Sequence, residues 1–411
     1  MDKVFELITR EGLRQKSQIH LIPSENIASE AVRKAVGSVL ANKYAEGYAG
    51  RRYYQGNSVV DEIENLAIER GKKLLGVPHI NVQPYSGSPA NAAVLMALVE
   101  PGDKICGLKL SGGGHLTHGH PNITFSGKYY TSVQYDVEED GRIDYEKLGK
   151  LVKTEKPKLI WAGTTAYPFI LDWERFRKVA DLVGAWLVAD ISHIVGLVVG
   201  AIHESPVQWA DVITSTTHKT LRGPRGAFIA VTEKGLQRDI DLAKKIDRAV
   251  FPGIQGGPHI NSIGGMAIAF EQANSFEFRE YAKQIVVNAK ALADSLRNEG
   301  FKVFGTENHL MVVEIGNHEE DGKIVGDGKA MAVALEKAGI IVNANTVPHD
   351  KAGPFRPSGI RIGTPWETTR GMKEEDMKKI AKWISEVRKN MDNQERLEEI
   401  EGEVLEYLNK F

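Results

Sequence analysis

Cysteine is almost absent from this chain, with Cys106 the only one among 411 residues. A single cysteine excludes an internal disulfide and a four-cysteine zinc site, and it suits a reducing compartment. An excess of charge of one sign is also lacking, because 52 basic and 54 acidic side chains leave a formal net charge of −2. We therefore expect no nucleic-acid partner and no attraction to an anionic membrane surface.

Long hydrophobic runs are lacking as well. The most apolar segment, residues 186–202, is interrupted by Asp190 and His193 and is too short to cross a membrane. The first 18 residues mix acids and bases and have no apolar core of the kind found in secretory signals. These features predict a cytoplasmic protein.

The motifs of two large classes of nucleotide-binding enzymes are missing. The nearest match to a dinucleotide-binding loop, GDGKAM at 326–331, ends in methionine and follows a polar stretch, and no Walker A sequence occurs. Hydride transfer and nucleotide hydrolysis are therefore unsupported. His115 and His118 have the spacing of a metal-binding pair, but no cysteine or carboxylate accompanies them, so we expect no metal site.

The order of elements predicts an α/β fold. A chain of this length favours two domains. Between residues 60 and 250, segments of helical period alternate with apolar runs expected to be strands at 79–84, 104–108, 158–163, 185–190, 210–214 and 226–231. This alternation predicts a mostly parallel sheet covered on both faces. Beyond residue 270, short strand candidates lie among helices rich in lysine and glutamate. We expect an N-terminal arm (1–24), a large domain (25–270) and a smaller α+β C-terminal domain (271–411).

A candidate phosphate site lies in YSGSPANAAVLMAL, residues 85–98. Ser88 is expected to be the N-cap of a helix, with Pro89 at its first position. Gly87 would allow close backbone approach, and the free N–H groups at the helix start attract phosphate. An ordinary capped helix explains the same pattern.

Two further residues suggest which cofactor the sheet holds. Asp190 ends an apolar strand, and a buried carboxylate there needs a cation, which a protonated pyridine nitrogen would supply. Lys219 follows another strand, in TSTTHKTLRG, with hydroxyl groups and His218 beside it. A phosphate anchor, a pyridinium partner and an amine are the parts that pyridoxal phosphate requires, with Lys219 forming the Schiff base. A solvated surface lysine is the alternative interpretation.

Several long blocks resemble serine hydroxymethyltransferases, which are fold-type-I pyridoxal-phosphate enzymes with an aspartate-aminotransferase-like large domain. The resemblance covers nearly the whole chain, in the family's order. The blocks are LIPSEN (21–26), NKYAEGYAGRRYYQG (42–56), QPYSGSPAN (83–91), GGHLTHG (113–119), DISHIVGLV (190–198), TTHKTLRGPRG (216–226), FPGIQGGP (251–258) and SGIRIGTP (358–365).

The resemblance implies a cofactor site in which Lys219 carries pyridoxal phosphate and Asp190 pairs with its ring nitrogen. Its cofactor-binding residues would be Ser86, Gly87, Ser88, His115, Thr165, Asp190, His193, His218, Lys219, Gly256 and Gly257. Of these, the last two glycines would come from a neighbouring subunit. His115 would stack on the ring, and His193 and Thr165 would approach its phenolic oxygen. The catalytic residues implied are Asp190, Lys219, Glu46, His115, His193, Thr216 and Tyr54.

The resemblance also implies how substrates bind. The contacts would be Ser24, Tyr44, Glu46, Tyr54, Arg361, Leu110, Leu116 and Asn345. Arg361 and Ser24 would bind the substrate carboxylate, which suits a guanidinium fork. Tyr44, Glu46 and Tyr54 would come from the partner subunit of a homodimer, with Glu46 as the acid–base group. The two leucines and Asn345 would contact the one-carbon carrier.

The expected reaction is reversible transfer of the hydroxymethyl carbon of serine to a tetrahydropterin, leaving glycine. Family members often have Ser-His-Gly-Gly where this chain has SGGG at 111–114, so the carrier is tetrahydrofolate or a modified form such as tetrahydromethanopterin. Tyr85, Pro89 and Ser192 also depart from residues common in the family. The alternatives are a pterin-independent β-hydroxy amino acid aldolase of the threonine type and a non-catalytic protein that binds pyridoxal phosphate or RNA.

Overall fold

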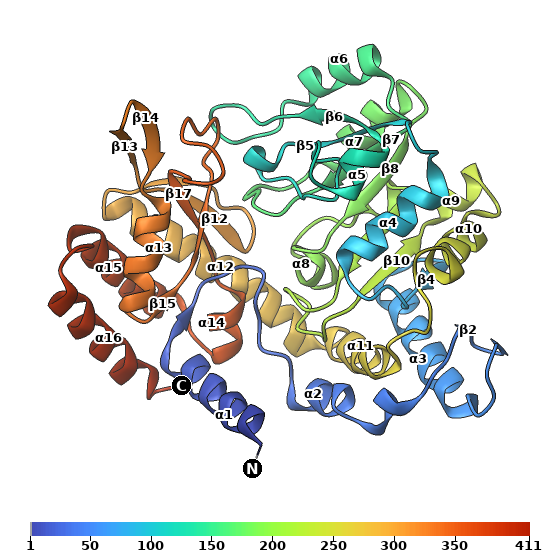
Figure 1. The fold of residues 1–411 in the computed structure, drawn as a ribbon, viewed down its shortest axis with the longest axis horizontal. Coiled ribbons are helices and arrows are strands. Elements are labelled where there is room, and N and C mark those ends of the chain that lie inside the picture. Colours follow the sequence, from blue (N-terminus) through green and yellow to red (C-terminus); the bar gives the residue numbers. More distant parts are fainter. Residues whose placement is uncertain (1) are drawn as a thin grey trace.

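The computed structural model describes residues 2–411 and contains a large and a small β-sheet connected by one long helix, α12 (Phe276–Asn298) (Figure 1). The large sheet has seven strands in the order β4-β10-β9-β8-β7-β5-β6. Their bounds are β4 (His79–Asn81), β5 (Lys104–Leu108), β6 (Thr131–Tyr135), β7 (Leu159–Gly163), β8 (Trp186–Asp190), β9 (Val212–Thr216) and β10 (Ala227–Val231). Strands β5 to β9 are parallel, whereas β10 pairs antiparallel with both β9 and β4. The predicted mostly parallel sheet is confirmed.

Successive residues of the central strands point to opposite faces of this sheet. In β7, Ile160 and Ala162 belong to one hydrophobic core, and Leu159 and Trp161 belong to the core on the other face. All five residues of β7 are buried. A strand buried on both sides has no polar alternation, which explains why these strands appear in the sequence as continuous apolar runs.

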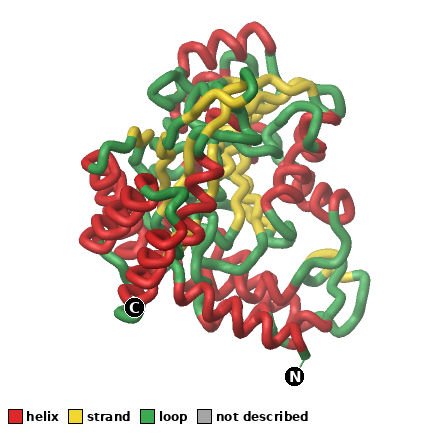
Figure 2. Tube along the Cα trace, turned by 60° about the vertical axis from the view of Figure 1, so that its left-hand side comes forward, coloured by secondary structure: helices red, strands yellow, loops and turns green. Residues whose placement is uncertain are grey.

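Helices cover both faces of the large sheet (Figure 2). In the small sheet, Met311, Val313, Ile360 and Ile362 pack on helices, whereas Val312 and Phe304 of the other face contact Ala166 of the large-sheet region. The N-terminal helices are α1 (Lys3–Ser17), α2 (Glu30–Val36), α3 (Ser58–Leu75), α4 (Gly87–Leu98), α5 (Phe125–Tyr129), α6 (Tyr145–Glu155), α7 (Trp173–Asp181) and α8 (Val195–Val199). They are followed by α9 (Glu233–Arg238), α10 (Leu242–Arg248), α11 (Ile260–Ala273), α13 (Gly328–Lys337), α14 (Pro365–Arg370), α15 (Glu374–Lys389) and α16 (Gln394–Leu408). Within residues 2–411, no helix is long and apolar enough to span a membrane.

The start of α4 corrects one sequence prediction. Ser88 is not the N-cap, because the helix begins at Gly87 with Ser86 in the cap position, and Ser86 makes no side-chain capping hydrogen bond. Pro89 is therefore the third helical residue. The first four helical N–H groups have no partner within a helix, so proline is tolerated anywhere in the first turn and does not identify the first residue.

The small sheet is antiparallel and has the order β11-β12-β17-β16. Its strands are β11 (Lys302–Phe304), β12 (Leu310–Glu314), β16 (Asn343–Asn345) and β17 (Gly359–Gly363). A hairpin of β13 (Asn317–Glu320) and β14 (Lys323–Gly326) extends from it, and the remaining short strands are β1 (Ile19–His20), β2 (Gly47–Tyr48), β3 (Arg51–Arg52) and β15 (Ile340–Ile341). The prediction that the C-terminal region is an α+β structure is confirmed.

The N-terminal segment belongs partly to the small sheet's core. Strand β1 pairs parallel with β15, and Ile19 and Leu21 are buried in the same hydrophobic cluster as α15 and α16. Helix α12 contributes its first half to the core of the large sheet and its second half to that of the small one. The proposed domain limits stay a prediction.

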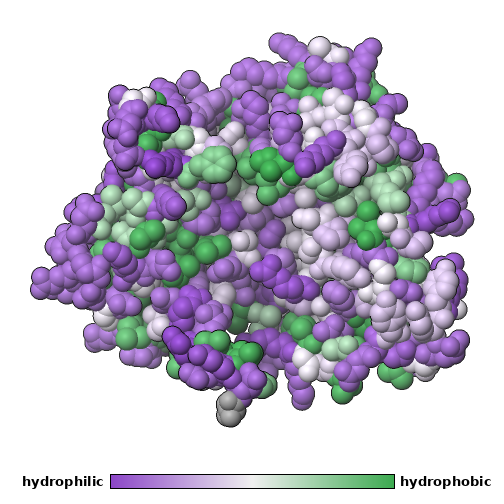
Figure 3. Space-filling model, in the orientation of Figure 1, coloured by the Kyte–Doolittle hydropathy of each residue, from purple (hydrophilic) through white to green (hydrophobic). Residues whose placement is uncertain are grey.

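Helix α1 has no buried residue, and hydrophobic side chains are visible at the surface near this end of the chain (Figure 3).

Candidate active site

The candidate site lies where the carboxyl ends of β7, β8 and β9 meet the start of α4 and strand β17 of the small sheet. Asp190 is the last residue of β8, Thr165 follows β7 by two residues, and Lys219 follows β9 by three. Arg361, in the middle of β17, donates from Nη1 to the backbone oxygen of Thr165 at 2.8 Å. The structure thus joins residues that are far apart in the sequence at one edge of the large sheet, where open α/β folds bind ligands.

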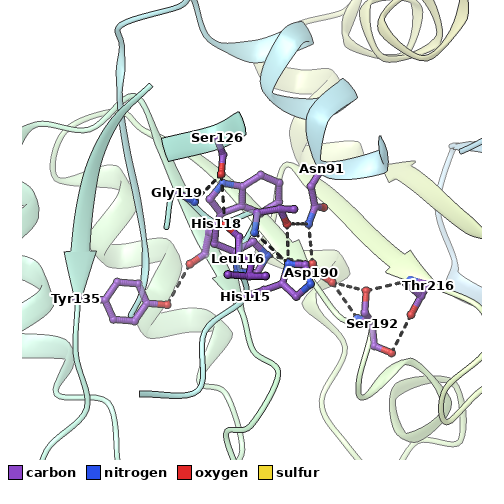
Figure 4. Close-up of polar contacts among 12 residues, drawn as sticks. Asn91, His115, Leu116, His118, Gly119, Ser126, Tyr135, Asp190, Ser192 and Thr216 are labelled. Carbon is purple, nitrogen blue, oxygen red and sulfur yellow. Dashed lines mark hydrogen bonds and ion pairs between the residues drawn. The ribbon is translucent and has the colours of Figure 1, made fainter. Parts of the chain in front are cut away.

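The Asp190 carboxylate is buried and accepts hydrogen bonds on both oxygens (Figure 4). Asn91 and His118 donate to Oδ2 at 2.9 and 3.0 Å, and Ser192 donates to Oδ1 from its hydroxyl at 2.6 Å and from its backbone N–H. Burial alone raises the pKa of this carboxyl, but the hydrogen bonds from His118 and Asn91, and the charge that the two nearby histidines carry when protonated in acid, outweigh burial and hold the pKa far below the ordinary range. Asp190 is therefore a permanent anion.

His118 is a residue that sequence reasoning missed as part of this network. Its ring stacks on Trp161 at 4.8 Å between centroids, with an angle of 9° between the planes. That packing directs Nε2 to Asp190. The spacing in HLTHGH is typical of a metal-binding pair, and the resemblance assigns a role to His115 alone, so neither indicates that His118 contacts Asp190. Asn91, on α4, links Asp190 to Thr117, whose hydroxyl contacts His115 Nδ1 at 2.7 Å.

The Lys219 side chain is buried, and its amine is attracted by the negative charge of Asp190. Burial lowers the pKa of its amine to about 8, against the opposing attraction of Asp190 and with further lowering by Arg361. Within residues 2–411, the amine has no hydrogen-bond partner, whereas the Lys219 backbone oxygen accepts from Asn26 at 2.9 Å. Asn26, in the LIPSEN block, therefore fixes the backbone and leaves the amine free to react, as Schiff-base lysines require.

The residues around Lys219 fit pyridoxal phosphate. A methyl group added to Gly87 would lie 2.9 Å from Cγ2 of Thr216, so the start of α4 packs directly against the end of β9. Thr216 is held there by a hydrogen bond from its N–H to the Ser192 hydroxyl. The hydroxyl oxygen of Thr165 is buried without a hydrogen-bond partner in the described chain. A helix N-terminus, a buried anion, a free amine and an unpaired hydroxyl are the donor set that the cofactor needs.

Two buried histidines lie beside Arg361. His193 Nδ1 is 3.2 Å from Nε2 of His309, a residue absent from the sequence-based site. Burial, reinforced by the positive charges of Lys219 and Arg361, lowers the pKa of His193 far below the ordinary value. Burial likewise lowers the pKa of His309 to about 3, that of His115 to about 4 and that of Arg361 to about 10. The histidines are neutral at pH 7.

A second cluster of predicted residues forms separately. The Tyr44 hydroxyl donates to Glu46 at 3.1 Å, and the Tyr44 and Tyr54 rings meet edge to face at 5.1 Å. A side-chain carbon on Gly256 would contact Glu46, and one on Gly257 would contact the Tyr44 ring. Within residues 2–411, none of these five residues hydrogen-bonds to Asp190, Lys219 or Arg361. In the single chain these residues therefore form a polar cluster of their own, and the Tyr85 hydroxyl, beside Ser86, donates to the Gly257 backbone oxygen at 2.7 Å.

The other predicted residues lie in two groups, one near Lys219 and one near the SGGG segment. Ser24 and His218 both line a cavity of about 450 Å³ whose lining does not include Asp190, Lys219 or Arg361. Burial lowers the pKa of His218 to about 3. Asn345 is on β16, and the hydroxyl of the next residue, Thr346, donates to the Ser111 backbone oxygen at 3.3 Å. That contact places Asn345 near the SGGG segment and the 3₁₀ turn that contains Leu110. Leu116 is half-exposed.

The fold and this arrangement of side chains define a fold-type-I pyridoxal-phosphate enzyme. The family model described as serine hydroxymethyltransferase matches residues 1–384. A relative from Desulfotalea psychrophila is 47% identical over 100% of this chain and 93% of its own length, and one from Acidothermus cellulolyticus is 51% identical over 93% and 87%. A third, from Sorangium cellulosum, is 49% identical over 100% and 94%. All three are named serine hydroxymethyltransferase. The chain belongs to the serine hydroxymethyltransferase family, which confirms the resemblance and the fold class.

Proposed function

We propose that this chain is a pyridoxal-phosphate-dependent glycine hydroxymethyltransferase that uses Lys219 and Asp190 as its central cofactor-binding residues. It transfers the hydroxymethyl carbon of serine reversibly to a tetrahydropterin and leaves glycine. Family membership supports the reaction. The observation that carries the assignment of residues is the buried, unpartnered Lys219 amine close enough to the Asp190 anion for its charge to act on the amine's pKa.

When bound, pyridoxal phosphate supplies an electron sink for the electron pair released as the serine carbon–carbon bond breaks. Asp190 would keep a proton on the ring nitrogen, because it stays anionic and is already oriented by Asn91, His118 and Ser192. The N–H groups at Ser86, Gly87 and Ser88 would hold the phosphate. His115 would pack on the ring, and His193 and Thr165 would contact the phenolic oxygen, with Thr216 and His218 beside Lys219.

Arg361 would bind the carboxylate of serine and glycine together with Ser24. The Arg361 guanidinium is buried and forms no ion pair with a carboxylate in residues 2–411. Its Nε and Nη1 atoms donate to Asn343 and Thr165, which fixes the plane of the group and leaves Nη2 without a protein partner. An uncompensated buried cation is costly, so an anionic ligand at this position is strongly favoured.

The separate cluster of Tyr44, Glu46, Tyr54, Gly256 and Gly257 would complete the site of a second subunit in a homodimer. Tyr44 and Tyr54 are about half-exposed, and helix α1 exposes the hydrophobic side chains Val4, Phe5, Ile8 and Leu13. Exposed apolar surface of this kind is typical of protein interfaces. In that arrangement Glu46 would act as the acid–base group between the serine hydroxyl and the pterin.

The carrier would bind between the large and small sheets, near Leu110, Leu116 and Asn345. The contact between Thr346 and Ser111 brings β16 to the SGGG segment, which supports this placement. Tetrahydrofolate and tetrahydromethanopterin both remain candidates. The cytoplasmic location expected from the sequence stays a prediction.

A test uses the purified full-length chain loaded with pyridoxal phosphate. Glycine formation from serine is measured with tetrahydrofolate, with tetrahydromethanopterin and without a carrier. Activity that depends on one carrier supports the proposal and identifies the pterin. Cleavage of threonine-type substrates at a rate that no carrier increases, together with no transfer from serine, would favour the aldolase alternative. Borohydride reduction followed by peptide mapping should label Lys219, and a label on another lysine would contradict the assignment.

A further inference from the structure

His309 is buried against the active site although nothing in the sequence analysis assigned it a role. It directly precedes β12 of the small sheet, and its backbone oxygen accepts from Thr364 at 3.1 Å. The neighbouring Asn308 donates to the backbone oxygens of Tyr167 and Phe169 in the large-sheet region. His309 is therefore held by contacts to both sheet regions, and its ring has little freedom to move.

The only hydrogen bond of the His309 ring within residues 2–411 is the 3.2 Å contact between its Nε2 and His193 Nδ1. Both rings are neutral, because burial and the charges of Lys219 and Arg361 disfavour protonation. A neutral imidazole carries one N–H and one lone pair. Exactly one of the two facing nitrogens must therefore hold the shared proton, and that choice fixes the tautomer of both rings.

The surroundings of His309 favour one of the two arrangements. If His193 Nδ1 were the donor, the His309 proton would sit on Nδ1, which is buried with no partner in the described chain. An unpaired buried N–H is rarely tolerated in folded proteins, which argues against this arrangement. If His309 Nε2 is the donor, its free Nδ1 presents a lone pair instead, and His193 must carry its own proton on Nε2.

The geometry points to His309 as a positioning residue that fixes His193 in the Nε2–H tautomer, so that His193 presents a hydrogen-bond donor to an anionic oxygen in the site. His193 Nε2 has no hydrogen-bond partner within residues 2–411 and so remains available to a ligand. The identity of the ligand rests on the proposed function, in which the atom that accepts this hydrogen bond is the phenolic oxygen of pyridoxal phosphate. A neighbour that fixes the tautomer of a histidine by bonding its other nitrogen is a familiar device at functional sites.

The first test reads the tautomer without any reaction. The full-length chain, labelled with ¹⁵N at histidine, is studied by long-range ¹H–¹⁵N NMR with and without pyridoxal phosphate, and the His193 signal is assigned with His193→Asn. We expect a proton on Nε2 of His193 in both forms. A proton on Nδ1 in the parent chain would overturn the inference by itself. Because the cofactor-free measurement needs no cofactor or turnover, it stands even if the proposed function fails.

Two substitutions test whether His309 is the cause. His309→Gln can place an amide donor near the position of Nε2, whereas His309→Leu removes the donor. We expect the glutamine variant to keep the His193 tautomer and the leucine variant to lose it. The affinity for pyridoxal phosphate should fall about tenfold in the leucine variant only, the cost of weakening one hydrogen bond to a charged group.

The matched control is His203→Gln, which replaces another buried histidine that does not contact His193. It should leave the His193 signals unchanged. Thermal unfolding identifies a variant that fails to fold. An unchanged tautomer in folded His309→Leu, or equal losses in the leucine and glutamine variants, would refute the positioning role. If neither variant folds, the tautomer of the parent chain still decides.

Discussion

Replacing Lys219 with methionine should make the cofactor-free chain more stable, even though it removes the central reactive group. The Lys219 side chain is buried, and its pKa is lowered from 10.5 to about 8. Keeping the amine charged at pH 7 therefore costs the folded state about 3 kcal/mol, since one pKa unit corresponds to about 1.4 kcal/mol. Methionine has a similar unbranched shape and no charge to bury, so Lys219→Met should recover most of this free energy.

The pH dependence gives this prediction its specific form. Below pH 8 the amine is protonated in both the folded and unfolded chains, so the cost is fully present. Between pH 8 and 10.5 the unfolded chain binds the proton more tightly, and the stability of the parent rises with pH. The advantage of Lys219→Met should therefore be greatest at or below pH 7 and should shrink toward zero near pH 10.5.

The assay is denaturant unfolding of the cofactor-free parent and Lys219→Met chains at several pH values between 6.5 and 10.5. Lys323→Met on the exposed β13–β14 hairpin is the control, because an exposed lysine should contribute little to stability. A Lys219→Met chain that is less stable than the parent at pH 7 would refute the reasoning. So would a gain that stays constant as the pH rises, because that would indicate improved packing and not the loss of a buried charge.

Three further predictions concern ligands and the partner subunit. Arg361→Lys should weaken serine binding about tenfold or more, because lysine cannot reproduce the guanidinium fork, and unchanged serine affinity by calorimetry would move the carboxylate site elsewhere. Asp190→Ala should reduce kcat by roughly two to three orders of magnitude while some cofactor still binds, and near-normal turnover would exclude the ring-nitrogen role. Glu46→Gln mixed with Lys219→Ala chains should regain pterin-dependent activity that neither has alone, and no regain in mixed dimers would contradict a site shared between subunits.

Sequence reasoning succeeded where a residue's position along a strand determined its place in the fold. Continuous apolar runs predicted six strands of the large sheet, and Asp190 and Lys219 lie just where β8 and β9 end. Strand β6 was not predicted, because it lies at the edge of the sheet and mixes exposed and buried residues. The sequence places the N-cap of α4 at Ser88, whereas the structure has it at Ser86. Proline is tolerated throughout the first helical turn, so Pro89 does not determine which residue begins the helix.

The polar network around the site could not be derived from local patterns. His118, Asn91 and Ser192 meet at Asp190 only because β8, α4 and the loop after β5 converge there. His309 is even less visible, since it reaches His193 across the two sheet regions from a position 116 residues away in the chain. No spacing rule links such residues. The proposed roles of Glu46 and Gly256 are a different case, because they would require a second chain, which the fold of one chain does not contain.

The charges around Lys219 would allow one site to bind both the cofactor and the substrates proposed for it. Lys219 and Arg361 are two buried cations that repel each other, and Asp190 is the buried carboxylate that opposes them. The site therefore has a surplus of buried positive charge, which destabilises the chain without ligands. A phosphate group and an amino-acid carboxylate each supply negative charge to that surplus. Binding of these anions should therefore raise the free energy of unfolding, because they bind only the folded chain. The unfavourable free energy of burying Lys219 and Arg361 as cations thus favours anionic ligands over neutral ones.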